Sequence, residues 1–154
     1  MTLHFAYGSN MSRALMRRRC PQVEEMGPAQ LVGWRFLITT DGYASVRPCP
    51  GQVVHGLLWR LSPRDRAAVD AYESLDSGLY RRRILPVRFK GRNTAALVYV
   101  ARTGPPGAPK PGYLELVIRA AQDAGLPDDY IRSLGRFSRS GWQGARRLET
   151  GEVR

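Results

Sequence analysis

Apolar and polar residues follow one another along this chain in two patterns, one typical of half-buried β-strands and one typical of amphipathic helices. Two apolar runs are joined by Asp41-Gly42, a dipeptide that favours a β-hairpin turn. A longer run is interrupted by Gly56, which predicts a bulge or a close approach of another backbone. In all, the pattern predicts six strands, at residues 3–7, 34–40, 43–47, 53–61, 82–89 and 94–101.

Helices are predicted between and after these strands. The strongest signal is Ser62-Pro63-Arg64-Asp65, because serine caps a helix, proline fits the first turn, and an acid three residues later suits the exposed amides. This helix should run to about residues 72–75. Another is expected at 113–124, where apolar residues recur at three-and-four spacing until Gly125 stops them. Shorter helices are expected at 12–19, capped by Ser12, and at 128–134.

The order of these elements is β–α–β–β–β–α–β–β–α–α. Antiparallel hairpins in that order favour an α+β fold over a parallel doubly wound sheet. The length of 154 residues suits a single domain, which we expect at 1–137, with a C-terminal tail at 138–154. The proline- and glycine-rich segment 103–112 is predicted to be a loop within that domain, not a linker between two.

Composition narrows the class of protein. Hydrophobic residues make up 43% of the chain, near the globular norm, and no apolar run reaches the ~20 residues of a membrane span. No signal peptide is recognisable, so we expect a cytoplasmic protein. His4, His55, Cys20 and Cys49 lack the close pairing typical of zinc ligands, so we expect no metal site. Whether the two cysteines pair is left open by the sequence.

The formal net charge of +11 raises an alternative function. Nearly all of it comes from arginine, with runs at 17–19 and 81–83. A basic protein of this kind could contact nucleic acid or another acidic partner, provided that the two runs share one face. The arginines are nevertheless spread over the whole chain among acidic residues, which makes nucleic acid the less favoured partner.

One short stretch stands out at the start of the chain, F-A-Y-G-S-N-M at residues 5–11. Glycine, serine and asparagine are ordinary turn residues, so the stretch could be a simple connection. A strand followed by a small-residue turn and a helix also presents unpaired N–H groups, which suit an anion. The sequence pattern alone does not decide between these two interpretations.

Glu73 is the carboxylate whose position is unusual. On the predicted helix it follows Val69 and Tyr72 on one side, so it should stand at the edge of the face that meets the sheet. Burying a carboxylate is costly unless the group is paired or protonated. The ordinary explanation is an ion pair with Arg81 or Arg82; the chemical one is a general acid/base.

Four collinear stretches, at residues 5–11, 50–61, 70–82 and 109–130, resemble the γ-glutamylcyclotransferase family, which includes the small AIG2-like and BtrG-like proteins. The resemblance covers most of residues 3–134. It implies a small mixed, mainly antiparallel β-barrel flanked by helices, with an active cavity at the 7–11 turn. The sequence departs from the family pattern at Ser45, His55 and Ser74, which puts the choice of substrate in doubt more than the chemistry.

The resemblance also implies an activity. Family enzymes cyclise a γ-glutamyl group: its α-amine attacks the γ-carbonyl, giving 5-oxoproline and a free amine. Such a reaction needs one base that can return the proton, a small-molecule γ-glutamyl substrate, and no cofactor. Glu73 is the expected acid/base, and the expected substrate-binding residues are Tyr7, Gly8, Ser9, Asn10, Met11, Tyr80 and Tyr113.

Overall fold

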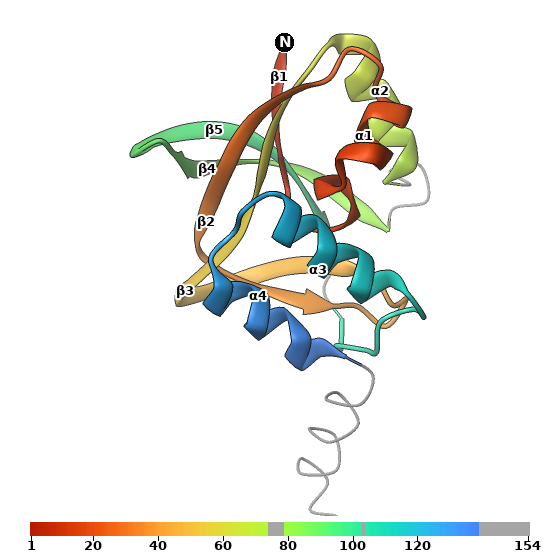
Figure 1. Cartoon of the computed structure of the whole chain (residues 1–154), viewed down its shortest axis with the longest axis vertical. Helices are drawn as coiled ribbons and strands as arrows, with labels where there is room; N and C mark the ends of the chain where they lie inside the picture. Colours follow the sequence, from red (N-terminus) through yellow and green to blue (C-terminus); the bar gives the residue numbers. More distant parts are fainter. Residues whose placement is uncertain (74–78, 103, 139–154) are drawn as a thin grey trace, which may run out of the picture.

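Five strands close into a barrel in the computed structural model, which describes residues 1–73, 79–102 and 104–138. The strands are β1 (Thr2–Ala6), β2 (Glu24–Ile38), β3 (Ala44–Leu61), β4 (Tyr80–Phe89) and β5 (Arg92–Ala101). Their order around the barrel is β1-β3-β2-β4-β5 (Figure 1). A parallel bridge between His4 and Leu97 closes it, and the other pairs are antiparallel. The predicted α+β class and mainly antiparallel barrel are confirmed.

The two longest strands correct the predicted strand list. β2 begins ten residues before the predicted start at residue 34, and β3 joins the two predicted strands 43–47 and 53–61 into one. The pairing jumps from Val32↔Val53 to Trp34↔Pro48, with Gly33 at φ 85° in between. In the sequence, the prolines and glycines at this irregularity predict the end of a strand. The structure instead bends one long ribbon there.

Helices cover the barrel at two places: α1 (Arg13–Arg19) and α2 (Pro63–Tyr72) lie together, while α3 (Tyr113–Asp123) and α4 (Asp128–Leu134) lie beside the far half of the β2–β3 ribbon (Figure 1). The predicted caps form: the Ser62 hydroxyl accepts from the Asp65 amide and the Ser12 hydroxyl from the Leu15 amide. Gly125 follows α3 at φ 72°, as a helix stop requires. The predicted tail begins beyond the last short turn, η3 (Gly135–Phe137); residues 139–154 of it lie outside the described residues.

The strands pack closely at Gly56. A Cβ at this position would lie 2.3 Å from the Ala6 carbonyl oxygen and 2.8 Å from the Phe5 ring. The predicted close approach of a second backbone is therefore confirmed, and it brings β1 against β3. Cys20 and Cys49 are free thiols, which answers the question of a disulfide. No helix within the described parts of the chain has the length and apolarity that crossing a bilayer requires.

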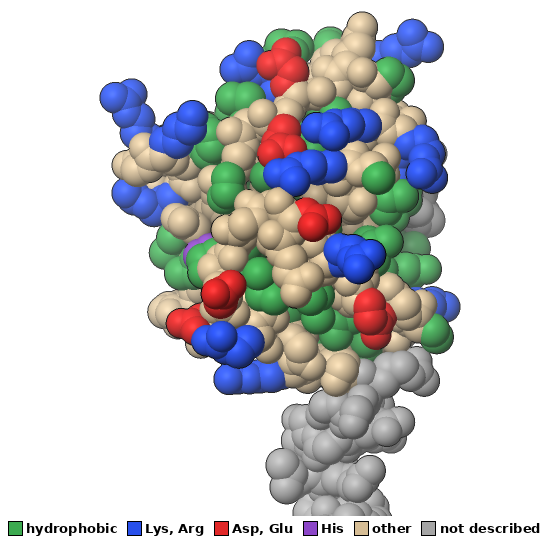
Figure 2. Space-filling view, viewed as in Figure 1, with side chains coloured by type: hydrophobic (Ala, Val, Ile, Leu, Met, Phe, Trp, Pro, Cys, Tyr) green, Lys and Arg blue, Asp and Glu red, His purple; other side chains and the backbone are tan. Residues whose placement is uncertain are grey.

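The arginine runs do not form one stripe. Arg82 makes an ion pair of 3.0 Å with Asp70, and strand alternation turns its neighbours Arg81 and Arg83 to the other side of β4. Arg19, from the other run, is turned inward toward the 7–11 turn. On the face seen in Figure 2, basic and acidic side chains are interspersed.

Candidate active site

The turn after β1 is held rigidly against the barrel. Residues 9–11 form a short 3-10 turn, η1 (Ser9–Met11), in which the Met11 amide donates to the Gly8 carbonyl at 3.0 Å. The indole N–H of Trp59, a fully buried residue of β3, donates to the Asn10 carbonyl at 2.9 Å. The first amides of such a turn, those of Ser9 and Asn10, have no acceptor inside the turn itself.

Glu73 directly follows Tyr72, the last residue of α2, and caps the C-terminal end of this helix. Its carboxylate accepts a hydrogen bond of 3.1 Å from the Asn10 amide nitrogen. The Asn10 amide oxygen accepts in turn from the Arg19 guanidinium at 2.5 Å. Among the ion pairs of the described residues there is none of Glu73 with Arg81 or Arg82, the ordinary explanation that the sequence left open. Asn10 instead bonds both the Glu73 carboxylate and the Arg19 guanidinium, so it links the carboxylate to the turn and to the Arg19 charge.

The surroundings of Glu73 change its acidity. Burial raises the pKa of the carboxyl from 4.5 to about 7, and the Arg19 charge and the Asn10 hydrogen bond partly oppose that rise. Desolvation therefore dominates. A carboxyl with a pKa near neutrality can both accept and return a proton at physiological pH.

Tyr72 is more exposed than the helix pattern predicts. The sequence places it on the apolar face of α2, but 43% of it is exposed. The Arg19 guanidinium lies 3.3 Å from the centre of its ring, and its hydroxyl shares a hydrogen bond of 3.1 Å with the Ser9 hydroxyl. Tyr72 and Arg19 were not among the predicted site residues, because nothing in the sequence separates Arg19 from the other arginines of its run.

The three predicted tyrosines lie near enough to this carboxylate for its charge to act on each of them. Tyr7 donates to a backbone carbonyl of β5 at 2.5 Å, and Tyr80 donates to the Ala44 carbonyl at 2.7 Å. The Tyr113 hydroxyl accepts from the Ala44 amide at 3.1 Å. Burial is the main cause that raises the pKa of each of them, that of Tyr113 to about 12, and the nearby Glu73 charge adds to it. All three hydroxyls therefore stay protonated at neutral pH.

Gly8 and Met11 play different parts in the turn. A Cβ on Gly8 would lie 2.9 Å from the Tyr113 hydroxyl oxygen, which also interacts with the Ser9 amide. Glycine therefore allows Tyr113 to approach the turn. Met11 is 1% exposed in the core, and its amide is used within the turn, so it holds the turn in place and presents no group to a ligand.

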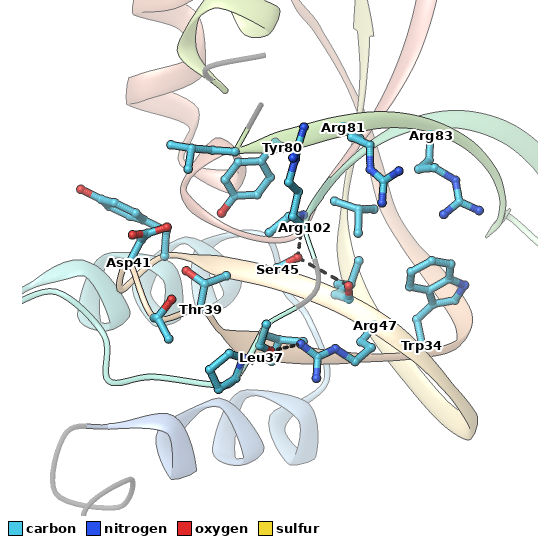
Figure 3. A pocket seen from close by; sticks show the side chains of 18 of the residues that line it. Trp34, Leu37, Thr39, Asp41, Ser45, Arg47, Tyr80, Arg81, Arg83 and Arg102 are labelled. Carbon is cyan, nitrogen blue, oxygen red and sulfur yellow. Dashed lines mark hydrogen bonds between the residues drawn. The ribbon is translucent and has the colours of Figure 1, made fainter. Parts of the chain in front are cut away.

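A pocket of about 580 Å³ lies behind the tyrosines, between the β2–β3 ribbon and the ends of β4 and β5 (Figure 3). Tyr80 and Ser45 form part of its wall; Glu73 and residues 7–11 do not. The Ser45 hydroxyl accepts from the Ala101 amide at 2.9 Å and also interacts with the Tyr7 hydroxyl. Ser45 and Tyr80 thus line the pocket and also interact with the residues around Glu73, Ser45 with Tyr7 and Tyr80 with the Glu73 charge. Among the described residues no group of His, Cys, Asp and Glu is arranged to hold a metal ion.

Comparison with known proteins agrees with the resemblance found in the sequence. The model of the AIG2-like family matches residues 53–134, more than half of the chain. A mouse protein named gamma-glutamylcyclotransferase is 24% identical over 155 residues, which cover 92% of this chain and 81% of the mouse protein. A human protein of the same name is 24% identical over 145 residues, covering 86% of this chain and 76% of its own.

Solved structures show the same fold. One named gamma-glutamyl cyclotransferase is similar with a TM-score of 0.83 at 23% identity, over 89% of this chain and 88% of its own. A second, of YkqA from Bacillus subtilis, has a TM-score of 0.78 at 25% identity over 88% of this chain and 53% of its own. With a family model matching over half its length and a barrel of this kind, the chain belongs to the AIG2-like family.

Proposed function

We propose that this protein is a γ-glutamylcyclotransferase-like enzyme that cyclises a small γ-glutamyl compound, with Glu73 as its acid/base. The observation that carries the proposal is the hydrogen bond from Asn10 to Glu73. It joins the turn that the family resemblance marks as the substrate site to a carboxylate whose pKa is raised to about 7. The relatives named gamma-glutamylcyclotransferase support the same activity.

The proposed reaction moves protons from the attacking nitrogen to the leaving nitrogen, with Glu73 as the carrier. Ionised Glu73 takes a proton from the substrate α-ammonium, and the freed amine nitrogen attacks the γ-carbonyl carbon. A tetrahedral intermediate forms, with its negative charge on the former carbonyl oxygen. The bond from that carbon to the leaving nitrogen then breaks while protonated Glu73 returns its proton to that nitrogen. The ring nitrogen also gives up its second proton, through the ionised Glu73, and this proton leaves on the released amine. The products are 5-oxoproline and an ammonium, Glu73 is ionised again, and no cofactor is needed.

The developing negative charge needs fixed donors. The amide of Asn10 is suited to that role, because it opens a turn that Trp59 holds in place, while the Ser9 amide already interacts with the Tyr113 hydroxyl. Tyr80 and Tyr113 are suited to binding the substrate, because both stay protonated and both are held by Ala44. Donors held in advance cost no reorganisation at the moment of reaction, which makes them effective in a desolvated site.

The alternative function, a basic protein that contacts nucleic acid, is less well supported. It requires the two arginine runs to form one surface. Arg19 is bonded to Asn10, and Arg82 is paired with Asp70 on the opposite side of β4 from its neighbours. Two of the six arginines are thereby used in contacts within the protein, and the rest are divided between α1 and β4.

A screen of γ-glutamyl compounds tests the proposal. The purified chain is incubated with γ-glutamyl amino acids, peptides and amines, and 5-oxoproline is measured by mass spectrometry. We expect 5-oxoproline and one equivalent of free amine from at least one compound. Absence of 5-oxoproline from all of them, together with salt-dependent binding of an oligonucleotide, would contradict the enzyme and favour the alternative.

A further inference from the structure

The pocket behind Tyr80 is lined by an unusual number of positive charges. Figure 3 shows Arg81 and Arg83 on one wall and Arg47 on the wall opposite. Arg102 and Lys110 bring the cationic side chains among the described lining residues to five, and Asp41 is the one acidic residue among those same residues. We call this cavity the arginine-lined pocket, after the residues Arg47, Arg81, Arg83, Arg102 and Lys110.

The local structure fixes several of these cations toward the pocket. Residues of β4 alternate between its two sides, so Arg81 and Arg83 face the pocket while Arg82 faces Asp70. The Arg83 guanidinium lies 5.9 Å from the centre of the Trp34 ring. The Arg47 guanidinium donates to the Gly104 carbonyl at 2.6 Å. The charges of Arg47 and Arg83 are thus held by contacts with the walls of the pocket.

None of these five cations forms an ion pair with a carboxylate of the described residues. The four ion pairs found there use Arg13, Arg60, Arg82 and Arg132, and none uses a cation of the arginine-lined pocket. Several like charges facing one cavity repel one another and raise the local concentration of anions. An anion with more than one negative charge gains most from such a site, because guanidinium groups bind carboxylates through paired hydrogen bonds.

The arginine-lined pocket adjoins the proposed active site. Tyr80 and Ser45 belong to its wall. Tyr80 also donates to the Ala44 carbonyl, and Ser45 also interacts with the Tyr7 hydroxyl. A γ-glutamyl group bound at Glu73 has to direct its amide substituent away from the turn. Because the pocket shares Tyr80 and Ser45 with this region, we place the substituent there, and the pocket volume of about 580 Å³ lies in the range of small-molecule sites.

The geometry points to a specificity: the arginine-lined pocket binds the leaving amine of the substrate, and this amine carries at least two carboxylates. The inference rests on the proposed function, because it names the leaving group of that reaction. An acidic amino acid or a short acidic peptide, joined through its nitrogen to the γ-glutamyl group, fits the charge and the size of the pocket. A polyamine does not, because its ammonium groups would face five cations.

Three substrates of nearly equal size test the inference. They are γ-glutamylglutamate, γ-glutamylglutamine and γ-glutamylglutamine α-amide, whose leaving amines carry two, one and no carboxylates. We expect kcat/KM to fall by about fivefold for each carboxylate removed, which corresponds to a partly exposed ion pair of about 1 kcal/mol. The difference should shrink as salt is added. Equal kcat/KM for all three compounds would overturn the inference.

Variants assign the effect to the pocket. The double variant Arg81→Gln/Arg83→Gln should reduce the ratio of kcat/KM between the first and third substrates by about fivefold or more. The control is Arg88→Gln, an exposed arginine of the same strand whose guanidinium bonds the Gly91 carbonyl at 3.1 Å, away from the pocket. The control should leave the ratio unchanged. An unchanged ratio in the double variant, or an equal fall in the control, would overturn the assignment.

A binding measurement separates failure of this inference from failure of the proposed function. Free glutamate and glutamine α-amide are titrated into the wild type and both variants, and binding is followed by NMR shifts of Arg81 and Arg83 neighbours. We expect tighter binding of glutamate, weakened in the double variant but not in the control. If no substrate yields 5-oxoproline, the function fails, whereas the anion site is still supported by this result. Indifference to glutamate, or a preference for an oligonucleotide, overturns the anion site itself.

Discussion

Replacing Glu73 with glutamine should stabilise the folded protein at alkaline pH. The pKa of this carboxyl rises from 4.5 to about 7 on folding, so the folded state holds its proton more tightly than the unfolded state. At any pH at which the unfolded protein ionises Glu73, folding therefore carries a free-energy penalty, because the charge must be buried or neutralised. That penalty is absent below pH 4.5, grows as the pH rises, and is complete once the pH exceeds about 7.

The magnitude follows from the same two values. Each pKa unit corresponds to about 1.4 kcal/mol, so the rise of Glu73 amounts to about 3 kcal/mol at pH 8.5 and less than about 1 kcal/mol at pH 5. Glutamine keeps the size of the side chain and an oxygen that accepts from Asn10. The Glu73→Gln variant should thus exceed the wild type in free energy of unfolding by about 2–3 kcal/mol at pH 8.5, and by little at pH 5.

Urea unfolding of both proteins at the two pH values measures this difference. The control is Glu115→Gln, an exposed carboxylate in the first turn of α3, which should change stability by less than about 0.5 kcal/mol at either pH. The reasoning is refuted if Glu73→Gln is destabilised equally at both pH values. That result would mean that the Glu73 charge is well solvated or well paired in the folded protein.

Two further substitutions probe the same region. Arg19→Met should raise the pKa of Glu73 further, because the Arg19 charge lowers it. The acidic limb of the pH–rate profile should therefore move up, by about one pH unit, the order expected when a single nearby opposite charge is removed. Arg18→Met on the same helix should not move it. Gly56→Ala should lower the melting temperature strongly, since a Cβ would lie 2.3 Å from a backbone oxygen. Gly135→Ala, where no atom lies within 4 Å, should not, and equal melting of the two would contradict the close approach at Gly56.

Most of the fold follows from local chemistry that the sequence displays. The Ser62 cap, the Gly125 stop and the Asp41-Gly42 turn are each specified by a few neighbouring residues, and each forms. The first half of β2 does not follow from its own sequence, E-E-M-G-P-A-Q-L-V, where glycine and proline interrupt any alternation. It is a strand because β3 lies beside it, and a partner distant in sequence leaves no local pattern.

Part of the candidate site could likewise be predicted from the sequence, and part could not. Glu73 and Asn10 could be singled out because one stands at the edge of an apolar helix face and the other in a turn of small residues. Their hydrogen bond could not, since it depends on how α2 meets the turn after β1. Arg19 was missed for a similar reason: its position over Tyr72 arises from the packing of α1 against α2. The arginine-lined pocket likewise combines residues from four strands and from the segments that precede or follow them.

The rate of 5-oxoproline formation by Glu73→Gln tests the central claim most directly. The wild type and the variant are compared on the best substrate found in the screen, with thermal melting confirming that both are folded. The account predicts a fall of at least ~10²-fold, the usual scale for losing a general base, because the amide can hold the hydrogen bond of Asn10 but cannot take a proton. Equal rates for the two folded proteins would show that Glu73 is not the base.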